Sequence, residues 1–207
     1  MSWSEFTALL LLATAVSFTP GPNTTLSAAM GAQGGMRHAL PFVCAVPVGW
    51  GLLLTLSTLG VGAIIMQTTH AKLVIAVLGA GYLVWLAKRL LGVKPAPATS
   101  QALPQDTVRV SFLAGIGLQF VNIKAWMLAL SIVAGWLTGQ QQLLARFATV
   151  LPVMMAYAFL SNLLYAWIGA ALRVWLQKGQ RLRWFNGFMA CNLLLTAAWI
   201  LMPFPVS

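Results

Sequence analysis

Two short polar clusters interrupt long apolar stretches of this chain, and they hold the residues best suited to chemistry. The first cluster is Ser17-Phe-Thr-Pro-Gly-Pro-Asn23. Pro20 and Pro22 lack the backbone N–H that a helix needs, and Gly21 between them tolerates unusual dihedral angles. A helix cannot continue regularly through this cluster, so backbone donors and acceptors become free to bind a polar partner. Asn23 follows the break and is suited to cap the helix that resumes there.

The second cluster, Leu118-Gln-Phe-Val-Asn-Ile-Lys124, places two amides and a full charge in an apolar run, and Asn122 stands 99 positions after Asn23. Burying the Lys124 ammonium in a bilayer costs on the order of 2.5–3.5 kcal/mol even on the lenient insertion scale. Snorkelling to an interface is the alternative. However, Lys124 lies 15 residues after Arg109, which is about 20 Å along a helix, against a membrane half-thickness near 15 Å. A position facing a polar cavity is therefore the favoured interpretation.

The two clusters together predict a binding site for a small polar solute. An unwound segment inside a membrane leaves N–H and C=O groups that need partners, and a polar substrate in a protein-lined cavity can supply them. The amides after Asn23 would face a substrate carboxylate, with Lys124 as its counter-charge. The structural alternative is a simple kink, since proline is commoner in membrane helices than in soluble ones. The predicted substrate-binding residues are Pro20, Gly21, Pro22, Asn23, Gln119, Asn122 and Lys124.

The elements that carry these clusters are membrane helices. Of the 207 residues, 60% are hydrophobic and 7% are charged, with a mean hydropathy of +0.86, whereas about a quarter of the residues of a soluble domain are charged. The apolar positions are continuous rather than alternating, which favours helices over the strands of an outer-membrane barrel. The first stretch has Glu5 but no Lys or Arg ahead of it, so we expect it to remain in the mature protein. Four stretches longer than the roughly 20 residues that span a bilayer lack Asp, Glu, Lys and Arg, namely 6–36, 38–71, 147–172 and 184–207.

We predict an all-α integral membrane protein with six transmembrane helices in a single membrane domain. A Pro- and Ala-rich linker at 94–108 separates a three-helix half at 1–93 from a second half at 109–207. Three crossings leave the chain on the other side, so the halves would insert as inverted repeats, a common plan in transporters. Helices one and four carry the polar clusters and are expected to be interrupted. The predicted helices are 3–33, 36–66, 70–93, 109–137, 143–172 and 182–204.

The net charge of +10 predicts topology rather than a nucleic-acid partner, because the basic residues lie in short segments between spans. Nine of the twelve cations fall in the loops after helices one, three and five, and two fall on the other side. The positive-inside rule therefore puts these three loops in the cytoplasm and both termini outside, in a bacterial inner membrane. The nine cations are Arg37, Lys88, Arg89, Lys94, Arg109, Arg173, Lys178, Arg181 and Arg183.

The remaining reactive side chains do not form recognisable sites. Cys44 and Cys191 lie in separate predicted helices without C-x-x-C spacing, so buried apolar thiols are the default interpretation. His38 and His70 have no metal-ligand spacing. We predict neither a metal nor another cofactor.

Few other polar groups lie inside the spans. Asn162 and Asn192 are second-tier candidates for substrate binding, although interhelical hydrogen bonds explain them better. The carboxylates, Glu5 and Asp106, lie outside the predicted membrane interior, which disfavours carboxylate-based coupling. If protons are coupled, Lys124 is the leading side-chain carrier, because burial disfavours its charged form. Protonation of the substrate itself is the competing explanation.

The motifs in this order resemble the lysine-exporter (LysE) family of small amino-acid efflux proteins, and within it the cysteine/O-acetylserine exporter subgroup. The resemblance covers the whole chain, and its most specific elements are Thr19-Pro-Gly-Pro-Asn23 and Leu118-Gln-Phe-Val-Asn-Ile-Lys124. Most of the family has proline where this chain has Ile123, and the cysteine-exporter subgroup is similar to this chain in having a branched aliphatic residue. The resemblance implies secondary active, proton-coupled antiport of cysteine, O-acetylserine, and also threonine or homoserine, from the cytoplasm to the exterior. It implies no enzyme activity.

Two other classes of function stay open at this point. A membrane-embedded thiol-transfer enzyme would need the sulfurs of Cys44 and Cys191 to approach each other. A structural membrane subunit would tolerate substitution in both clusters and leaves the buried lysine unexplained. Small-residue faces at 28–31 and 166–170 join helices either within one chain or between chains. A homodimer surrounded by membrane lipid is the favoured assembly.

Overall fold

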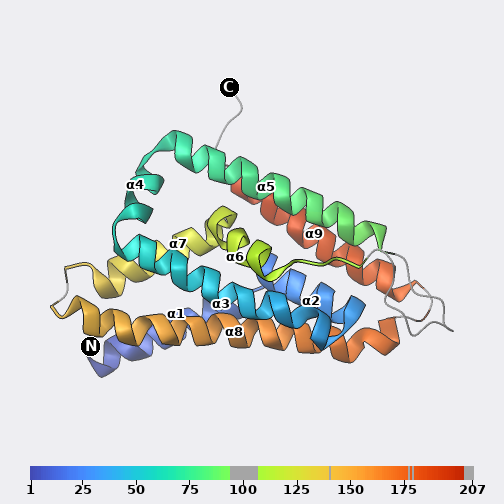
Figure 1. The fold of residues 1–207 in the computed structure, drawn as a ribbon, viewed down its shortest axis with the longest axis horizontal. Coiled ribbons are helices and arrows are strands. Elements are labelled where there is room, and N and C mark those ends of the chain that lie inside the picture. The colour runs from blue at the N-terminus through green and yellow to red at the C-terminus, as the bar shows by residue number, and fades with distance from the viewer. Residues whose placement is uncertain (94–106, 140, 177, 179, 203–207) are drawn as a thin grey trace.

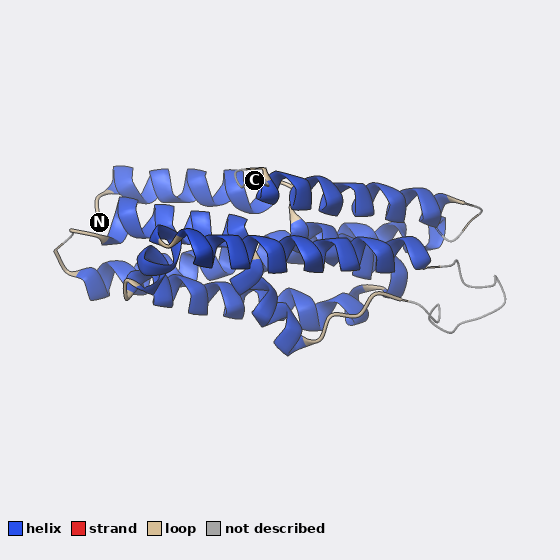
Figure 2. Cartoon of the chain, turned by 90° about the horizontal axis from the view of Figure 1, so that it is seen from above, coloured by secondary structure: helices blue, strands red, loops and turns tan. Residues whose placement is uncertain are grey.

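The computed structural model describes residues 1–93, 107–139, 141–176, 178 and 180–202. Within these residues every regular element is helical, and most helices run along the long axis of an elongated bundle (Figure 1; Figure 2). The first half of the chain forms α1 (Trp3–Phe18), α2 (Pro22–Gly34), α3 (Met36–Thr58), α4 (Val61–Gln67) and α5 (Thr69–Gly92). The second half forms α6 (Phe112–Val121), α7 (Ile123–Ile132), the π-helical turn η1 (Val133–Leu137), α8 (Leu143–Leu176) and α9 (Arg181–Leu201).

The described helices confirm an all-helical protein with several potential membrane spans. By length and composition, α3, α5, α8 and α9 can each cross a bilayer. The segment from α6 through α7 and η1 bends by 70° and is a fifth span if it crosses as one unit. α1 is apolar but has 16 residues, fewer than the roughly 20 that a straight span needs. A sixth span therefore requires α1 and α2 together, and the six-span count stays a prediction.

Several helix boundaries differ from the sequence prediction. The predicted helix 36–66 is divided at Gly60, whose left-handed conformation (φ +87°) ends the first part and starts α4. The predicted helix at 109–137 begins only at Phe112, because residues 107–110 are not helical. α8 continues to Leu176, beyond the predicted end at 172. Most of the predicted linker, residues 94–106, lies outside the described residues.

The most extensive helix pairing joins α2 to α8 through small residues. A Cβ added to Gly31 would lie 2.1 Å from the Ala166 carbonyl oxygen, and one added to Gly169 would lie 2.1 Å from the Ala28 carbonyl oxygen. The two backbones therefore touch, as in membrane helix pairs where close packing replaces a hydrophobic driving force. The small-residue faces at 28–31 and 166–170 thus pack on each other within one chain. The predicted homodimer loses this support and stays a prediction.

The bundle has one basic end. The C-terminal ends of α2, α5 and α8 lie together at the right of Figure 1, while the N-terminus and the first residues of α5 and α8 lie at the left. The sequence assigns nine cations to the loops after helices one, three and five. Eight of them belong to described residues next to these right-hand ends, and Lys94 lies outside the described residues. Two of them stack on tryptophans, as the Arg89 guanidinium lies 5.4 Å from the Trp85 ring and the Arg181 guanidinium 4.5 Å from the Trp175 ring. The charge asymmetry of the sequence is therefore an asymmetry in space.

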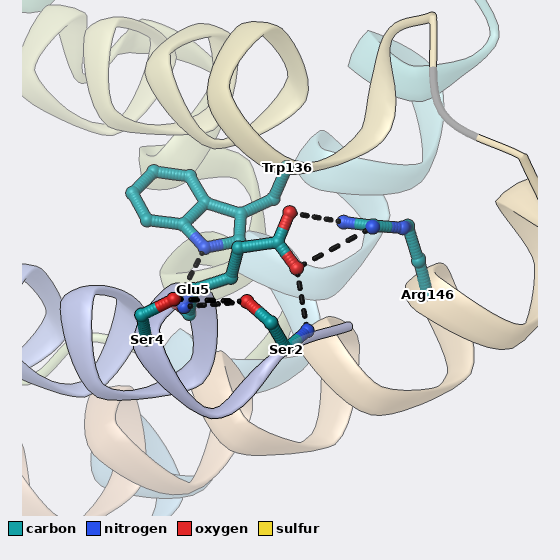
Figure 3. A network of polar contacts seen from close by, with 5 residues as sticks. All are labelled: Ser2, Ser4, Glu5, Trp136 and Arg146. Carbon is teal, nitrogen blue, oxygen red and sulfur yellow. Dashed lines mark hydrogen bonds and ion pairs between the residues drawn. The ribbon is translucent and has the colours of Figure 1, made fainter.

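Glu5 fixes the opposite end. Ser2 caps α1, since its hydroxyl accepts from the Glu5 amide (3.2 Å) and its own amide donates to the Glu5 carboxylate (2.6 Å). Arg146 of α8 donates to the same carboxylate at 3.2 Å, and the Trp136 indole N–H of η1 donates to the Glu5 carbonyl at 2.9 Å (Figure 3). Glu5 thus ties three elements together, far along the helix from the break after α1.

We expect Gly31→Ala to destabilise the protein by about 1–3 kcal/mol, because the new methyl group overlaps the α8 backbone. For a chain of this length, each kcal/mol corresponds to a fall of about 2–4 °C in Tm. The measurement is thermal unfolding in detergent. Gly187→Ala is the control, since a Cβ at Gly187 meets nothing within 4 Å. Equal Tm values for the two variants would contradict the close contact.

Candidate functional site

The first predicted interruption is present between α1 and α2. α1 ends at Phe18, and α2 begins at Pro22, whose fixed φ suits a first helical turn. Gly21 is the N-cap in an extended conformation, and its amide donates to the Thr24 hydroxyl at 2.9 Å. The Tyr165 hydroxyl of α8 donates to the Phe18 carbonyl at 2.9 Å and so occupies one acceptor that the broken helix leaves free.

The second interruption is present at Asn122, between α6 and α7. Asn122 adopts an extended conformation (φ −91°, ψ 98°), and the span bends by 70°. The break forms without proline, because the Trp126 indole N–H donates to the Phe120 carbonyl at 2.8 Å and replaces a lost helical hydrogen bond. A Cβ added to Gly79 would lie 2.2 Å from the Val121 carbonyl oxygen. The bend is therefore pressed directly against α5.

A pair of amides connects the two breaks. The Asn23 side-chain nitrogen donates to the Gln119 side-chain oxygen at 2.8 Å, and the Gln119 side-chain nitrogen donates back to the Asn23 side-chain oxygen at 3.3 Å. Gln119 is fully buried and also donates to the Gly115 carbonyl within α6. The prediction that Asn23 caps α2 is wrong, because Thr24 supplies that cap and Asn23 points to the other broken span. Residues 96 positions apart are thereby paired.

Lys124 lies where the two breaks meet. Its ammonium donates to the Thr19 carbonyl at 3.4 Å. It would be 3.3 Å from a Cβ at Gly21, so a larger residue than glycine would crowd it. Lys124 is the second residue of α7, and Gly21 is the N-cap of α2. Two helix N-termini, each with the positive end of its dipole, therefore converge on a side chain that is itself cationic. This arrangement favours an anion.

No carboxylate among the described residues pairs with this charge. Among the described residues the ion pair that forms joins Arg146 to Glu5, and Glu5 lies 14 residues, or about 21 Å of helix, from Thr19. Asp106, the other carboxylate in the sequence, lies outside the described residues. An ammonium that is partly buried without a carboxylate is suited to receive the carboxylate of a ligand.

A cavity of about 70 Å³ lies at this junction. This volume exceeds the 10–15 Å³ that one water needs but is below the 300–1,000 Å³ of ordinary ligand pockets, so side chains must move to admit even a small solute. The lining combines the two breaks with apolar and polar residues of α3 and α8. The lining residues are Val16, Ser17, Thr19, Gly21, Pro22, Asn23, Thr24, Val46, Trp50, Asn122, Lys124, Ala125, Leu128, Met154, Ala158, Ser161 and Asn162.

The predicted site residues divide into those that line the cavity and those that support it. Gly21, Pro22, Asn23, Asn122, Lys124 and Asn162 line it. Pro20 is exposed at the break and is not part of the lining. Gln119 bonds to Asn23 and does not itself line the cavity. Asn192 is also outside the lining, and its side-chain oxygen accepts a 3.2 Å hydrogen bond from the Thr25 hydroxyl. Asn162 accepts from Ser27 at 2.8 Å while lining the cavity, so the expected interhelical hydrogen bonds exist for both second-tier residues. Substrate binding by any of these residues stays a prediction.

Sequence reasoning missed the walls that other helices supply. Trp50 of α3, with Met154 and Ser161 of α8, lines the cavity. The adjacent polar residues Ser161 and Asn162 in an otherwise apolar helix could have predicted that this face of α8 lines the cavity. Trp50 and Met154 carried no signal, because single apolar residues do not show which face of a membrane helix meets a cavity.

A second polar network holds residues 107–110 at the basic end. The Val108 amide donates to the Gln33 side chain at 2.9 Å, and the His38 ring pairs with the Val108 carbonyl at 2.8 Å. Gln33 also donates to the Asn186 oxygen at 3.3 Å. Val108 is 2% exposed. This buried segment is joined to α2, α3 and α9, so the chain enters α6 from a fixed position.

Comparison with known protein families matches residues 14–202 to the LysE type translocators. The chain belongs to the LysE type translocator family. It is 27% identical over 185 residues to the "Cysteine/O-acetylserine efflux protein" of Klebsiella pneumoniae, covering 89% of this chain and 92% of that protein. It is 26% identical over 168 residues to the protein of the same name from Escherichia coli O1:K1, covering 80% and 83%. An "Uncharacterized membrane protein" of Vibrio cholerae is 37% identical over 79 residues, 38% of each chain. No solved structure matches the chain.

This family assignment confirms the resemblance predicted from the two polar motifs, both of which lie within the matched residues. Together with the apolar helices it establishes a multi-pass membrane translocator. The matched LysE region also includes both breaks and the whole cavity lining.

The amide pair between the breaks makes a quantitative prediction. In a double-mutant cycle of Asn23→Ala and Gln119→Ala, the stability effects should be non-additive by about 0.6–1.7 kcal/mol, the range found for hydrogen bonds between membrane helices. Unfolding in detergent measures each free energy. In the control cycle, Thr149→Ala replaces Gln119→Ala, since the Thr149 hydroxyl bonds only within α8 among the described residues. Additive effects in both cycles would show that the amide pair does not couple the breaks.

Proposed function

We propose that this protein is a secondary active exporter of small neutral amino acids or their derivatives, moving them from the cytoplasm to the exterior. The candidate substrates are cysteine and O-acetylserine, with threonine and homoserine as further members of the class. The observation that carries the proposal is the convergence of Lys124 and two helix N-termini on one cavity at the helix breaks. The names of the Klebsiella and Escherichia relatives favour the same substrates.

The cavity suits the class of substrate in charge and in size. Lys124 and the N-terminus of α2 favour a carboxylate, which every amino acid carries. Val46, Trp50 and Met154 form an apolar wall for a short side chain. A cavity of about 70 Å³ requires little widening for a small substrate and much more for a large one. Size and a single carboxylate therefore support a small neutral amino acid over a peptide or a lipid.

The proposed orientation in the membrane rests on the basic end of the bundle. The positive-inside rule places that end in the cytoplasm, and both termini then lie outside. The proposed arrangement is an inverted repeat, supported by the packing of α2 on α8 and of α6 on α3. In each case the broken span of one half packs on the middle helix of the other half. The third helices of the halves, α5 and α9, pack on each other.

Proton coupling is part of the proposal, with Lys124 as the side-chain carrier. A lysine with few polar partners can lose its proton when the cavity closes around it and regain it from water when the cavity opens. A substrate carboxylate would favour the charged form, which links substrate binding to protonation. The two conformations needed for alternating access would then differ in the charge of the Lys124 side chain.

The test uses inverted membrane vesicles with an imposed proton gradient and labelled cysteine, O-acetylserine, threonine, homoserine and lysine. The wild type should accumulate a neutral amino acid above its external concentration. The initial rate of uptake by Lys124→Gln should be at least tenfold lower than that of the wild type. Lys178→Gln is the charge-matched control, because Lys178 is exposed at the basic end.

Three results would contradict parts of the proposal. If the wild type inserts correctly and accumulates none of these amino acids, the substrate class is wrong, and the thiol-transfer and structural alternatives regain support. If wild type and Lys124→Gln accumulate equally, the exporter stands but Lys124 is not its centre. If uptake only equilibrates the concentrations, the protein is a passive channel.

A further inference from the structure

One acceptor in the cavity wall lacks a donor. The Asn122 side-chain oxygen is buried and has no hydrogen-bond partner among the described residues, and the whole residue is 7% exposed. Buried polar groups are nearly always paired, and an unpaired one is costly. The other cavity asparagines differ, since the oxygens of Asn23 and Asn162 accept from Gln119 and Ser27. Among the asparagines that line the cavity, Asn122 is thus the one whose side-chain oxygen accepts no hydrogen bond from the described residues.

The chemistry of the proposed substrates favours an ammonium as the donor. Asn122 is the C-cap of α6 and also the N-cap of α7, so opposite ends of two helix dipoles meet there and do not decide the sign of the ligand group. The Asn122 side-chain oxygen is neutral, so it can accept a hydrogen bond from an ammonium without forming a permanent ion pair with it. The Lys124 ammonium donates to the Thr19 carbonyl on the other break and does not donate to the Asn122 side-chain oxygen. A ligand ammonium has three donors and can give one of them to the unpaired Asn122 side-chain oxygen.

We propose that Asn122 binds the α-ammonium group of the substrate through its side-chain oxygen and thereby fixes the substrate's orientation. This inference rests on the proposed function. The carboxylate then lies toward Lys124 and the N-terminus of α2, and the side chain lies toward Trp50 and Met154. The two breaks then bind different groups, because the Asn122 side chain at the second break receives the ammonium and the N-terminus of α2 at the first break faces the carboxylate.

This orientation predicts that recognition depends on an intact α-amino acid. A solute with the carboxylate alone leaves the Asn122 oxygen unpaired, and a solute with the ammonium alone leaves Lys124 without a counter-charge. A site built to hydrogen-bond a group discriminates strongly against an analogue that lacks it. Selectivity between side chains is then left to the apolar wall.

The test measures competition with labelled cysteine, under reducing conditions, for binding to the full-length protein in detergent. The competitors are cysteine, 3-mercaptopropionate, which lacks the ammonium, and cysteamine, which lacks the carboxylate. In the wild type each truncated competitor should bind at least tenfold more weakly than cysteine. Asn122→Ala should weaken cysteine binding roughly tenfold, the loss expected for a hydrogen bond to a charged group, and should change 3-mercaptopropionate binding less than twofold.

Two further variants separate recognition from folding. Asn122→Asp keeps an acceptor oxygen and should retain cysteine binding and the preference for ligands with an ammonium, even if Asn122→Ala does not fold. Asn186→Ala is the matched control, because Asn186 is also a buried asparagine whose side-chain nitrogen has no partner among the described residues, but it lies outside the cavity. It should leave the ratio of the three affinities unchanged.

The outcomes distinguish this inference from the proposed function. Equal weakening of cysteine and 3-mercaptopropionate by Asn122→Ala, or loss of the ammonium preference in Asn122→Asp, would show that Asn122 has only a structural role, while the exporter proposal stands. Failure of the wild type to bind cysteine, O-acetylserine, threonine or homoserine would instead overturn the proposed function and this inference with it.

Discussion

A bilayer offers no water to backbone groups that a broken helix leaves unpaired, and the arrangement of this protein follows from that constraint. Each break is closed by side chains from elsewhere, with Tyr165 donating to the end of α1 and Trp126 to the end of α6. Asn23 and Gln119 then join the two breaks. The Asn122 side-chain oxygen has no partner among the described residues and belongs to a residue of the cavity lining, where a ligand can satisfy it. Helices α2, α6, α7 and α8 all supply side chains to the contacts at the breaks.

The same junction places the Lys124 ammonium among apolar helices. Lys124 has no carboxylate partner among the described residues, while Glu5 is bound to Arg146 near the N-terminus. Holding a cation in this way is costly unless a ligand compensates for it. Close contact between α2 and α8 through Gly31 and Gly169 stiffens the wall around the cavity. A closely packed helix pair beside two helix breaks suits the proposed alternating access.

Much of this could be predicted from the sequence, because prolines and charges in apolar runs have few physical explanations. Pro20, Pro22 and Lys124 predicted both breaks and their shared site, and the apolar stretches predicted membrane helices. The sequence could not show that Asn23 binds Gln119 rather than capping α2, since that choice depends on how the halves pack. The division at Gly60 was missed because one glycine in an apolar run does not show its φ. The walls from α3 and α8 depend on helix rotation, which a nearly uniform apolar composition leaves open.

The central claim is that the cavity between the breaks holds the transported amino acid, and substrate protection tests it most directly. In a background of Cys44→Ser and Cys191→Ser, a thiol reagent is applied to the Ser161→Cys variant, because Ser161 lines the cavity. Thr149→Cys, on the exposed face of α8, is the control. We predict that O-acetylserine or threonine slows labelling at position 161 several-fold and leaves position 149 unchanged. Unchanged labelling at position 161, in a protein that still transports these amino acids, would contradict the claim.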